Sequence, residues 1–168
     1  EAGSGNGTAW PEDGSIYSGN WVDDYPDGKG TYLFPDGTEY EGGFIRGKKH
    51  GQGTFKEADG FVSYDGEWKD GQRFGKGRVN KRDSSSYDGD WLDGKPHGNG
   101  MFTYPDGRVY TGTMKQGLRQ GLGELRRSDG SIAYEGEWDK NLRHGKGKAY
   151  SASGLIKFDG DFYEGYQS

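Results

Sequence analysis

Residues 87–109 read YDGDWLDGKPHGNGMFTYPDGRV, and this pattern returns along the whole chain. Tyr87, Gly89 and Trp91 follow one another at a spacing of two, which places both aromatic rings on one face of a β-strand. A Gly-x-Gly pair comes next, and then a second alternating stretch and an Asp-Gly turn. The stretch therefore predicts one β-hairpin with an aromatic face and a polar face.

The first aromatic residue of the pattern recurs at intervals of 23 or 24 residues, at Tyr17, Tyr40, Tyr64, Tyr87, Tyr110, Tyr134 and Phe158. The chain is therefore interpreted as one array, expected to be part of a longer protein. A half repeat at 1–16 precedes six full repeats at 17–39, 40–63, 64–86, 87–109, 110–133 and 134–157, and a second half repeat covers 158–168.

The glycines of each repeat have separate predicted roles. One slot in the hairpin loop holds Gly47, Gly71, Gly94, Gly117, Asp24 or Asn141, and these residue types predict a positive φ there. Asp-Gly pairs such as Asp36-Gly37 predict the turns between hairpins. The glycines within strands are expected to leave room for a ring of the neighbouring hairpin to lie over the backbone.

No segment carries an apolar stripe at helical spacing, so the predicted fold is all-β. We expect an elongated single-layer antiparallel sheet of about 14 strands, a solenoid-like rod of tandem hairpins. Hydrophobic residues make up only 29% of the chain, but aromatic residues make up 15% and glycines number 34. In a single layer of this composition the aromatic rings are the available core.

The composition argues against several functions. There is no cysteine, and the net charge of −5 disfavours nucleic-acid binding. No cluster of nucleophile, base and acid interrupts the repeats, so we expect no enzymatic activity and no cofactor. His50, His97 and His144 occupy one slot in alternate repeats, about 19 Å apart at four strands' separation, which is too far for a shared metal ion. They are interpreted as loop residues that hydrogen-bond their own turns.

These residues resemble the MORN repeat family, whose signature runs Tyr-x-Gly-x-Trp, Gly, His-Gly-x-Gly and a turn glycine. The best copies are YEGEWDKNLRHGKG at residues 134–147 and YDGDWLDGKPHGNG at residues 87–100. The resemblance covers nearly the whole chain. It implies an accessory array that binds proteins, self-associates or contacts membranes, as in the junctophilins, the radial spoke head proteins of cilia and several cytoskeletal proteins.

Two functional hypotheses follow. The first is a protein-interaction scaffold that binds a partner helix or peptide in its aromatic trough, or that assembles a cytoskeletal, ciliary or membrane-contact complex. The predicted partner-binding residues are Tyr17, Trp21, Tyr40, Phe44, Tyr64, Trp68, Tyr87, Trp91, Tyr110, Met114, Tyr134 and Trp138. The alternative is a peripheral membrane module whose basic loop residues contact acidic phospholipids. Its predicted lipid-binding residues are Arg46, Lys48, Lys49, Arg73 and Lys76.

The expected location is the cytoplasm, at the cytoskeleton, a cilium or the membrane periphery, because a chain without cysteine suits a reducing compartment. The strands near residues 7–11 and 158–162 are expected to be sheet edges. Acidic residues at both, such as Asp159 and Asp161, predict a monomer at low ionic strength that associates weakly as salt rises.

Overall fold

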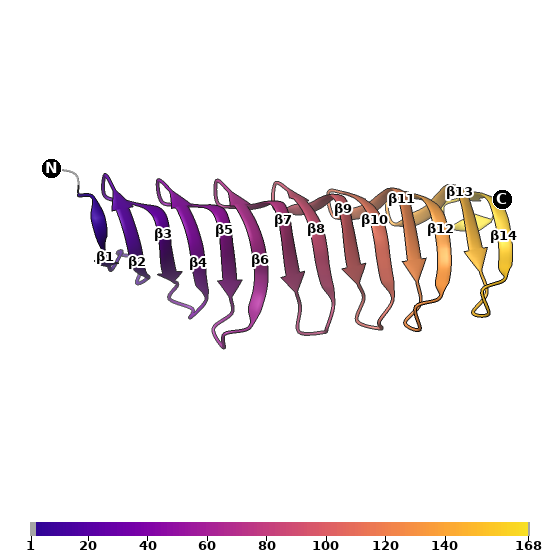
Figure 1. Ribbon diagram of the computed structural model, residues 1–168, viewed down its shortest axis with the longest axis horizontal. Coiled ribbons are helices and arrows are strands. Elements are labelled where there is room, and N and C mark those ends of the chain that lie inside the picture. Colours follow the sequence, from indigo (N-terminus) through magenta and orange to yellow (C-terminus); the bar gives the residue numbers. More distant parts are fainter. Residues whose placement is uncertain (1–2, 168) are drawn as a thin grey trace. The chain divides into compact units, whose positions relative to one another are not determined.

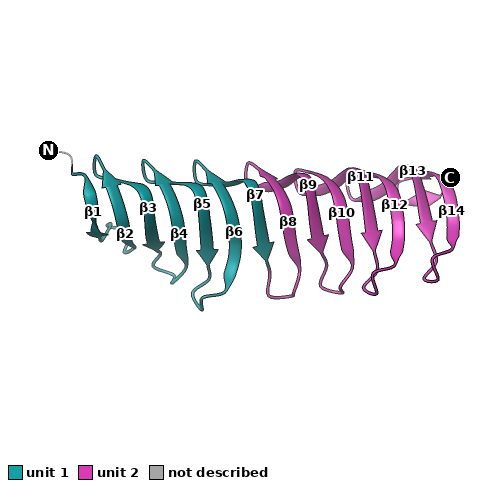
Figure 2. Cartoon of the chain, viewed as in Figure 1, with its two compact units in different colours: residues 1–80 teal, residues 81–168 magenta. Residues whose placement is uncertain are grey.

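The computed structural model describes residues 3–167, and within them every regular element is a β-strand (Figure 1). The chain divides into two compact units, residues 1–80 and 81–168, and each is described by itself (Figure 2). In both units the strands form a single antiparallel layer in sequence order. The all-β hairpin architecture expected from the repeat is therefore confirmed.

The first unit contains seven strands, each hydrogen-bonded to the strands next to it in sequence. They are β1 (Gly5–Ala9), β2 (Ile16–Val22), β3 (Tyr25–Leu33), β4 (Glu39–Ile45), β5 (Lys48–Lys56), β6 (Val62–Lys69) and β7 (Gln72–Asn80). Two-residue loops join β2 to β3, β4 to β5 and β6 to β7, so each full repeat is one tight hairpin.

The second unit continues the same pattern with eight strands. They are β8 (Ser86–Leu92), β9 (Lys95–Thr103), β10 (Val109–Lys115), β11 (Leu118–Arg126), β12 (Ile132–Asp139), β13 (Leu142–Tyr150), β14 (Ile156–Tyr163) and β15 (Tyr166–Gln167). The expected last edge strand lies inside β14, and it pairs on its outer side with the two residues of β15.

The hairpin of each full repeat carries a β-bulge at the same place. In the second repeat Gly42 pairs with Gly53, but Phe44 pairs with Lys49. Three residues of β5, numbers 50–52, therefore oppose the single residue Gly43 of β4. The extra residues interrupt the ladder of hydrogen bonds at this point. Backbone groups of the return strand can therefore be reached by the side chain that faces the bulge from the first strand.

The turns have the conformations that the sequence predicted. Gly47, Gly71, Gly94 and Gly117 have φ between 75° and 86°, while Asp24 and Asn141 have φ of 63° and 73°. Between hairpins, the turn aspartate accepts the amide N–H two residues later, as Asp36 does from Thr38 at 2.9 Å. Ser84 replaces the usual turn glycine and keeps a φ of 68°, so this substitution leaves the turn geometry unchanged.

The strand glycines do make room for rings, but the expected source of the ring was wrong. Tyr40 lies over Gly42 and Gly53, which belong to its own hairpin rather than to a neighbouring one. Its hydroxyl group donates a hydrogen bond to the carbonyl oxygen of Gly43 at 3.0 Å. Because the tyrosine folds back toward the loop of its own repeat, its ring closes over both strands of that hairpin. The same hydrogen bond recurs from Tyr17, Tyr64, Tyr87, Tyr110 and Tyr134.

Candidate functional site

The first tyrosine and the Trp-position residue of each repeat form an inner row of side chains in the core. Eleven of the twelve predicted partner-binding residues are at most 6% exposed, and Trp21 is half-buried. In the first, second and sixth repeats, the tyrosine ring contacts the Trp-position ring of its own repeat edge to face and also that of the following repeat. Tyr40 lies 5.1 Å from Phe44 and 5.2 Å from Trp68, centroid to centroid. Each of these tyrosine rings therefore joins two consecutive hairpins.

The partner of the Trp position on the return strand is a cation in four repeats. Phe44 pairs with Lys49, Trp68 with Arg73, Met114 with Arg119 and Trp138 with Arg143. This pairing places the cations on the aromatic face. Arg119 stacks with its Cζ 4.2 Å from the Trp138 ring centroid, and its Nη2 donates a 2.6 Å hydrogen bond to the carbonyl oxygen of Asn141. Lys49 and Arg73, which the sequence predicted as basic loop residues, therefore lie on the aromatic face.

Lys49 has the most enclosed position of these cations. Its Nζ lies 5.1 Å from the centroids of Phe34 and Tyr40, 4.7 Å from Phe55 and 4.8 Å from Trp68. Burial lowers the pKa of the Lys49 ammonium group to about 8, and the nearby positive charge of Arg73 acts in the same direction. Burial also raises the pKa of the Tyr64 hydroxyl to about 12. The aromatic face is therefore a low-dielectric environment.

An outer row of rings lies on the same face and is only half-buried. In the first unit, Tyr32 lies 4.9 Å from Phe34, and Phe34 lies 6.1 Å from Phe55. In the second unit, Phe102 lies 4.8 Å from Tyr104. These five residues, hereafter the outer rings, were not among the predicted site residues. Their alternation on the return strand was the signal that identifies them.

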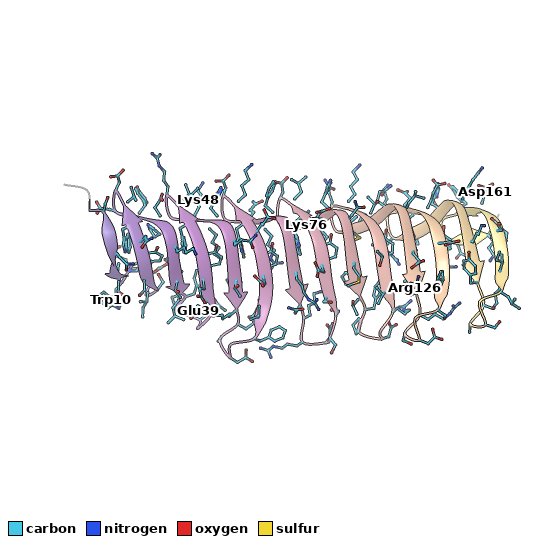
Figure 3. All side chains as sticks on the ribbon, viewed as in Figure 1. Trp10, Glu39, Lys48, Lys76, Arg126 and Asp161 are labelled. Atoms are coloured by element: carbon cyan, nitrogen blue, oxygen red, sulfur yellow. The ribbon has the colours of Figure 1, made fainter. Side chains whose placement is uncertain are left out.

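The predicted lipid-binding residues fall into two groups. Arg46 and Lys48 are exposed beside the β4–β5 loop, and Figure 3 shows Lys48 on the loop side of the sheet, opposite Glu39. Lys76 is also exposed, on the polar face of β7. Lys49 and Arg73, by contrast, lie over aromatic rings, with Arg73 Cζ 4.8 Å from the Tyr64 centroid. The structure therefore separates two residues of this set from the loop edge.

The histidines lie within strands, so the loop interpretation was wrong. His50 belongs to β5, His97 to β9 and His144 to β13. The Nδ1 atom of His50 is buried without a hydrogen-bond partner among the described residues. Within residues 3–167 no group of three His, Asp or Glu side chains is arranged to hold a metal ion. The same residues contain no helix long and apolar enough to cross a membrane.

The hairpin geometry agrees with a comparison of the sequence with known families. The MORN repeat model matches residues 17–39, 40–61, 64–80, 87–107, 110–132 and 134–156. The chain belongs to the MORN repeat family. Its MORN repeats begin where the periodic tyrosines begin, and the match to the third repeat is the shortest, ending before the Ser84 turn.

Comparisons with individual proteins add little to this assignment. No curated protein matches the MORN array significantly. One solved structure to which the chain is similar is the TCP domain of SAS-4 (dCPAP), in complex with a proline-rich motif of Ana2 (dSTIL), of Drosophila melanogaster. The two chains are 12% identical with a TM-score of 0.49, and the alignment covers 90% of this chain and 87% of that one.

Proposed function

We propose that this MORN array is a non-catalytic scaffold that binds a partner helix or extended peptide on its aromatic face. The observation that carries this proposal is the contiguous row of half-exposed rings formed by Tyr32, Phe34 and Phe55. Adjacent aromatic side chains that remain partly in water favour a protein contact, because covering them removes apolar area from solvent.

The buried inner row supports these rings rather than contacting the partner first. Tyr17 lies 6.2 Å from Tyr32, and Lys49 spans from the inner ring of Tyr40 to the outer rings of Phe34 and Phe55. A partner seated on the outer rings therefore meets a surface held by the core. The proposed contact residues are the outer rings. The inner residues that the sequence predicted as partner-binding support these rings from the core.

Replacement of outer rings tests the scaffold proposal. The Phe34→Ser/Phe55→Ser variant and the wild-type chain are used as baits in a pull-down that is analysed by mass spectrometry. Leu33→Ser is the matched control, because Leu33 is a similarly exposed apolar residue adjacent in sequence but on the other face of β3. A partner retained by Leu33→Ser and lost by Phe34→Ser/Phe55→Ser supports the proposal. A partner retained equally by both variants contradicts it, provided that all three chains melt cooperatively.

A membrane contact is the second candidate, and a different observation favours it. Exposed cations and exposed apolar side chains share the loop edge of the first unit: Arg46 and Lys48 lie beside Val22, Tyr25 and Ile45 on consecutive hairpins. Basic residues attract anionic headgroups, and apolar side chains next to them can enter the interface. This edge is distinct from the outer rings, so the two candidates can be tested separately.

Co-sedimentation with liposomes tests the membrane candidate. We expect binding to vesicles containing phosphatidylinositol phosphates, weakened by modest salt and lost in Arg46→Glu/Lys48→Glu. Reversal of Lys49 is avoided, because its ammonium group packs on four rings and a carboxylate there would disrupt the core. Equal sedimentation of the wild type with neutral and anionic vesicles would exclude this mode of binding.

The array is proposed to act in the cytoplasm, at the cytoskeleton, a cilium or the membrane periphery. Support comes from the absence of cysteine in the sequence and from the accessory role that the family resemblance implies. Fractionation of cells that express the tagged chain tests the location. Recovery in a cytoskeletal or membrane pellet that depends on Phe34 or on Lys48 would also connect the location to one of the two surfaces.

A further inference from the structure

The hairpin bulge holds a carboxylate in three repeats. Glu67 accepts the backbone N–H of Lys76 at 2.9 Å, Asp90 accepts that of Asn99 at 2.9 Å, and Glu137 accepts that of Lys146 at 3.0 Å. Each carboxylate lies over the first glycine of the Gly-x-Gly pair in its own bulge, hereafter the bulge glycine, so that a methyl group on Gly75, Gly98 or Gly145 would come within 2.9 Å of it. The bulged backbone is therefore a recurring acceptor position for a carboxylate.

The second repeat has a bulge at the same place but lacks the carboxylate. Gly43 occupies the slot of Glu67 and brings no side chain to the amide of Gln52, and a methyl group at Gly43 would overlap the carbonyl oxygen of His50. A methyl group on Gly51 would meet no atom within 4 Å, whereas the corresponding places at Gly28 and Gly121 are occupied by Asn20 and Thr113. Of the six bulges, the one in the second repeat alone leaves the space over its bulge glycine open.

This open place lies in a groove on the polar face of the first unit. The groove has a volume of about 770 Å³, and its lining runs from Asn6 on β1 to Asp65 on β6. Six adjacent strands span roughly 24 Å, which an extended peptide of about seven residues covers. Gly43, Gly51 and Gln52 line its middle. The groove can therefore hold a peptide that runs across the strands.

Two further polar groups border the open place. Lys29 stands directly opposite Gly43 in the β3–β4 register, and no carboxylate among the described residues pairs with it. His50 also lines the groove, with its Nδ1 atom unsatisfied. A buried polar atom without a partner is uncommon in folded proteins. The acids at the rim are engaged, since Glu41 pairs with Lys56 at 3.0 Å and Asp65 accepts a hydrogen bond from Thr54 at 3.3 Å.

We propose that this groove binds an extended acidic peptide of a partner protein, with one Asp or Glu carboxylate placed over Gly51. That carboxylate accepts the backbone N–H of Gln52, as Glu67 accepts that of Lys76, and it pairs with the ammonium group of Lys29. The partner thus supplies the side chain that Gly43 omits. The site lies on the face opposite the outer rings, so it goes beyond the scaffold proposal and does not depend on it.

The test follows backbone amides by ¹H–¹⁵N NMR during titration of the full chain with hexaglutamate. We expect the Gln52 amide to shift and to saturate. The amides of Lys76, Asn99 and Lys146 serve as internal controls and should not move, because their own carboxylates occupy them. Hexaglutamine should leave Gln52 unshifted. A Gln52 amide that does not saturate with hexaglutamate, or that responds equally to hexaglutamine, overturns the proposal.

Matched variants sharpen the result. Lys29→Gln should weaken hexaglutamate binding about two- to fivefold, the range for an exposed ion pair, whereas Lys146→Gln, at the same slot of the sixth repeat, should have no effect. Glu67→Gly should open an equivalent place and make the Lys76 amide responsive. Acetate that binds Gln52 as tightly as hexaglutamate would overturn the assignment to a peptide. These readouts are independent of Phe34 and Phe55, so failure here leaves the scaffold proposal untouched.

Discussion

The ring of Tyr40 lies against the α-carbon of Gly53 so closely that a methyl group at Gly53 would overlap it. Tyr17 meets Gly30, Tyr64 meets Gly77 and Tyr110 meets Gly123 in the same way. The close approach of each tyrosine ring therefore requires glycine at the strand position that the ring covers. This relationship explains why a chain with so many glycines still forms a packed sheet, since these strand glycines receive the tyrosine rings.

Gly53→Ala should destabilise the protein, because the added methyl group must displace the Tyr40 ring or the backbone. We expect a loss of about 1–3 kcal/mol in the free energy of unfolding, as for other overpacked cores. Gly7→Ala is the matched control, since Gly7 also lies in a strand but has no atom within 4 Å of the new methyl group. Urea unfolding measures both variants, and similar midpoints for the two would contradict the prediction.

Trp68→Ala and Trp91→Ala should each cost about 3–5 kcal/mol of stability, the usual cost of removing a buried large aromatic ring. The two rings are 6% and 5% exposed, and the Trp68 indole also donates a 3.0 Å hydrogen bond to the carbonyl oxygen of Gly53. Trp10→Ala should change stability little, because Trp10 is 73% exposed. Unchanged melting temperatures for both core variants would show that the aromatic face is not the core.

Lys49 should make stability rise with pH under alkaline conditions. The pKa of its ammonium group is lowered from 10.5 to about 8 in the folded chain, so the unfolded chain binds more protons between these values. Stability then increases as pH rises from about 8 to 10.5. The free energy of unfolding of the wild type, measured relative to Lys49→Met, should rise through this window. The comparison with Lys49→Met cancels the opposing loss from buried tyrosines such as Tyr64. A flat difference would contradict the lowered pKa.

Asn141 combines two properties that substitutions can separate. Its φ is 73°, and its side-chain oxygen accepts the backbone N–H of Arg119 at 2.9 Å. Asn141→Gly keeps the conformation and loses the hydrogen bond, at a cost of about 0.5–1.5 kcal/mol. Asn141→Ala should cost about 1–2 kcal/mol more, because alanine disfavours positive φ. Thermal or chemical unfolding gives both values, and equal stability of the two variants would argue against strain at this loop.

Ionic strength should control self-association. Most of the outer edge of β14 has no paired strand among the described residues, because β15 pairs only with Phe162 and Tyr163. Asp159 and Asp161 place negative charge along this edge, so we expect a monomer at low salt and weak association as screening increases. Light scattering across a salt series tests this expectation. A stable low-salt dimer that persists in Asp159→Lys/Asp161→Lys would instead indicate a dedicated dimer surface.

The sequence was sufficient to predict the hairpins because spacing alone specified them. Tyr87, Gly89 and Trp91 determine the face, and the loop slot at Gly94 determines the turn, since both depend on local backbone geometry. The contacts that side chains make across neighbouring strands were harder to predict. The position of Lys49 over four rings depends on the bulge, which shifts its partner to Phe44, and no spacing rule revealed that shift.

The open place at Gly51 illustrates the same limit. The sequence shows a glycine at position 43, but only the three-dimensional contact between Glu67 and the Lys76 amide reveals what that glycine omits. The inner rings show a different limit. Period-two spacing identified them as one row. It could not distinguish a ring that is buried against its own hairpin from a ring that remains exposed to solvent. Alternation on the return strand indicates the outer rings, but only the fold shows that they remain half-exposed.

Pairing between consecutive strands alone has a mechanical consequence. In each unit every strand is hydrogen-bonded only to the strands before and after it in sequence, so tension applied at one terminus loads the ladder one bond at a time. Each hairpin can then peel away without breaking the next. Release of one 23-residue repeat would lengthen a tethered chain by up to about 80 Å, which makes such an array a compliant link between whatever its two ends hold.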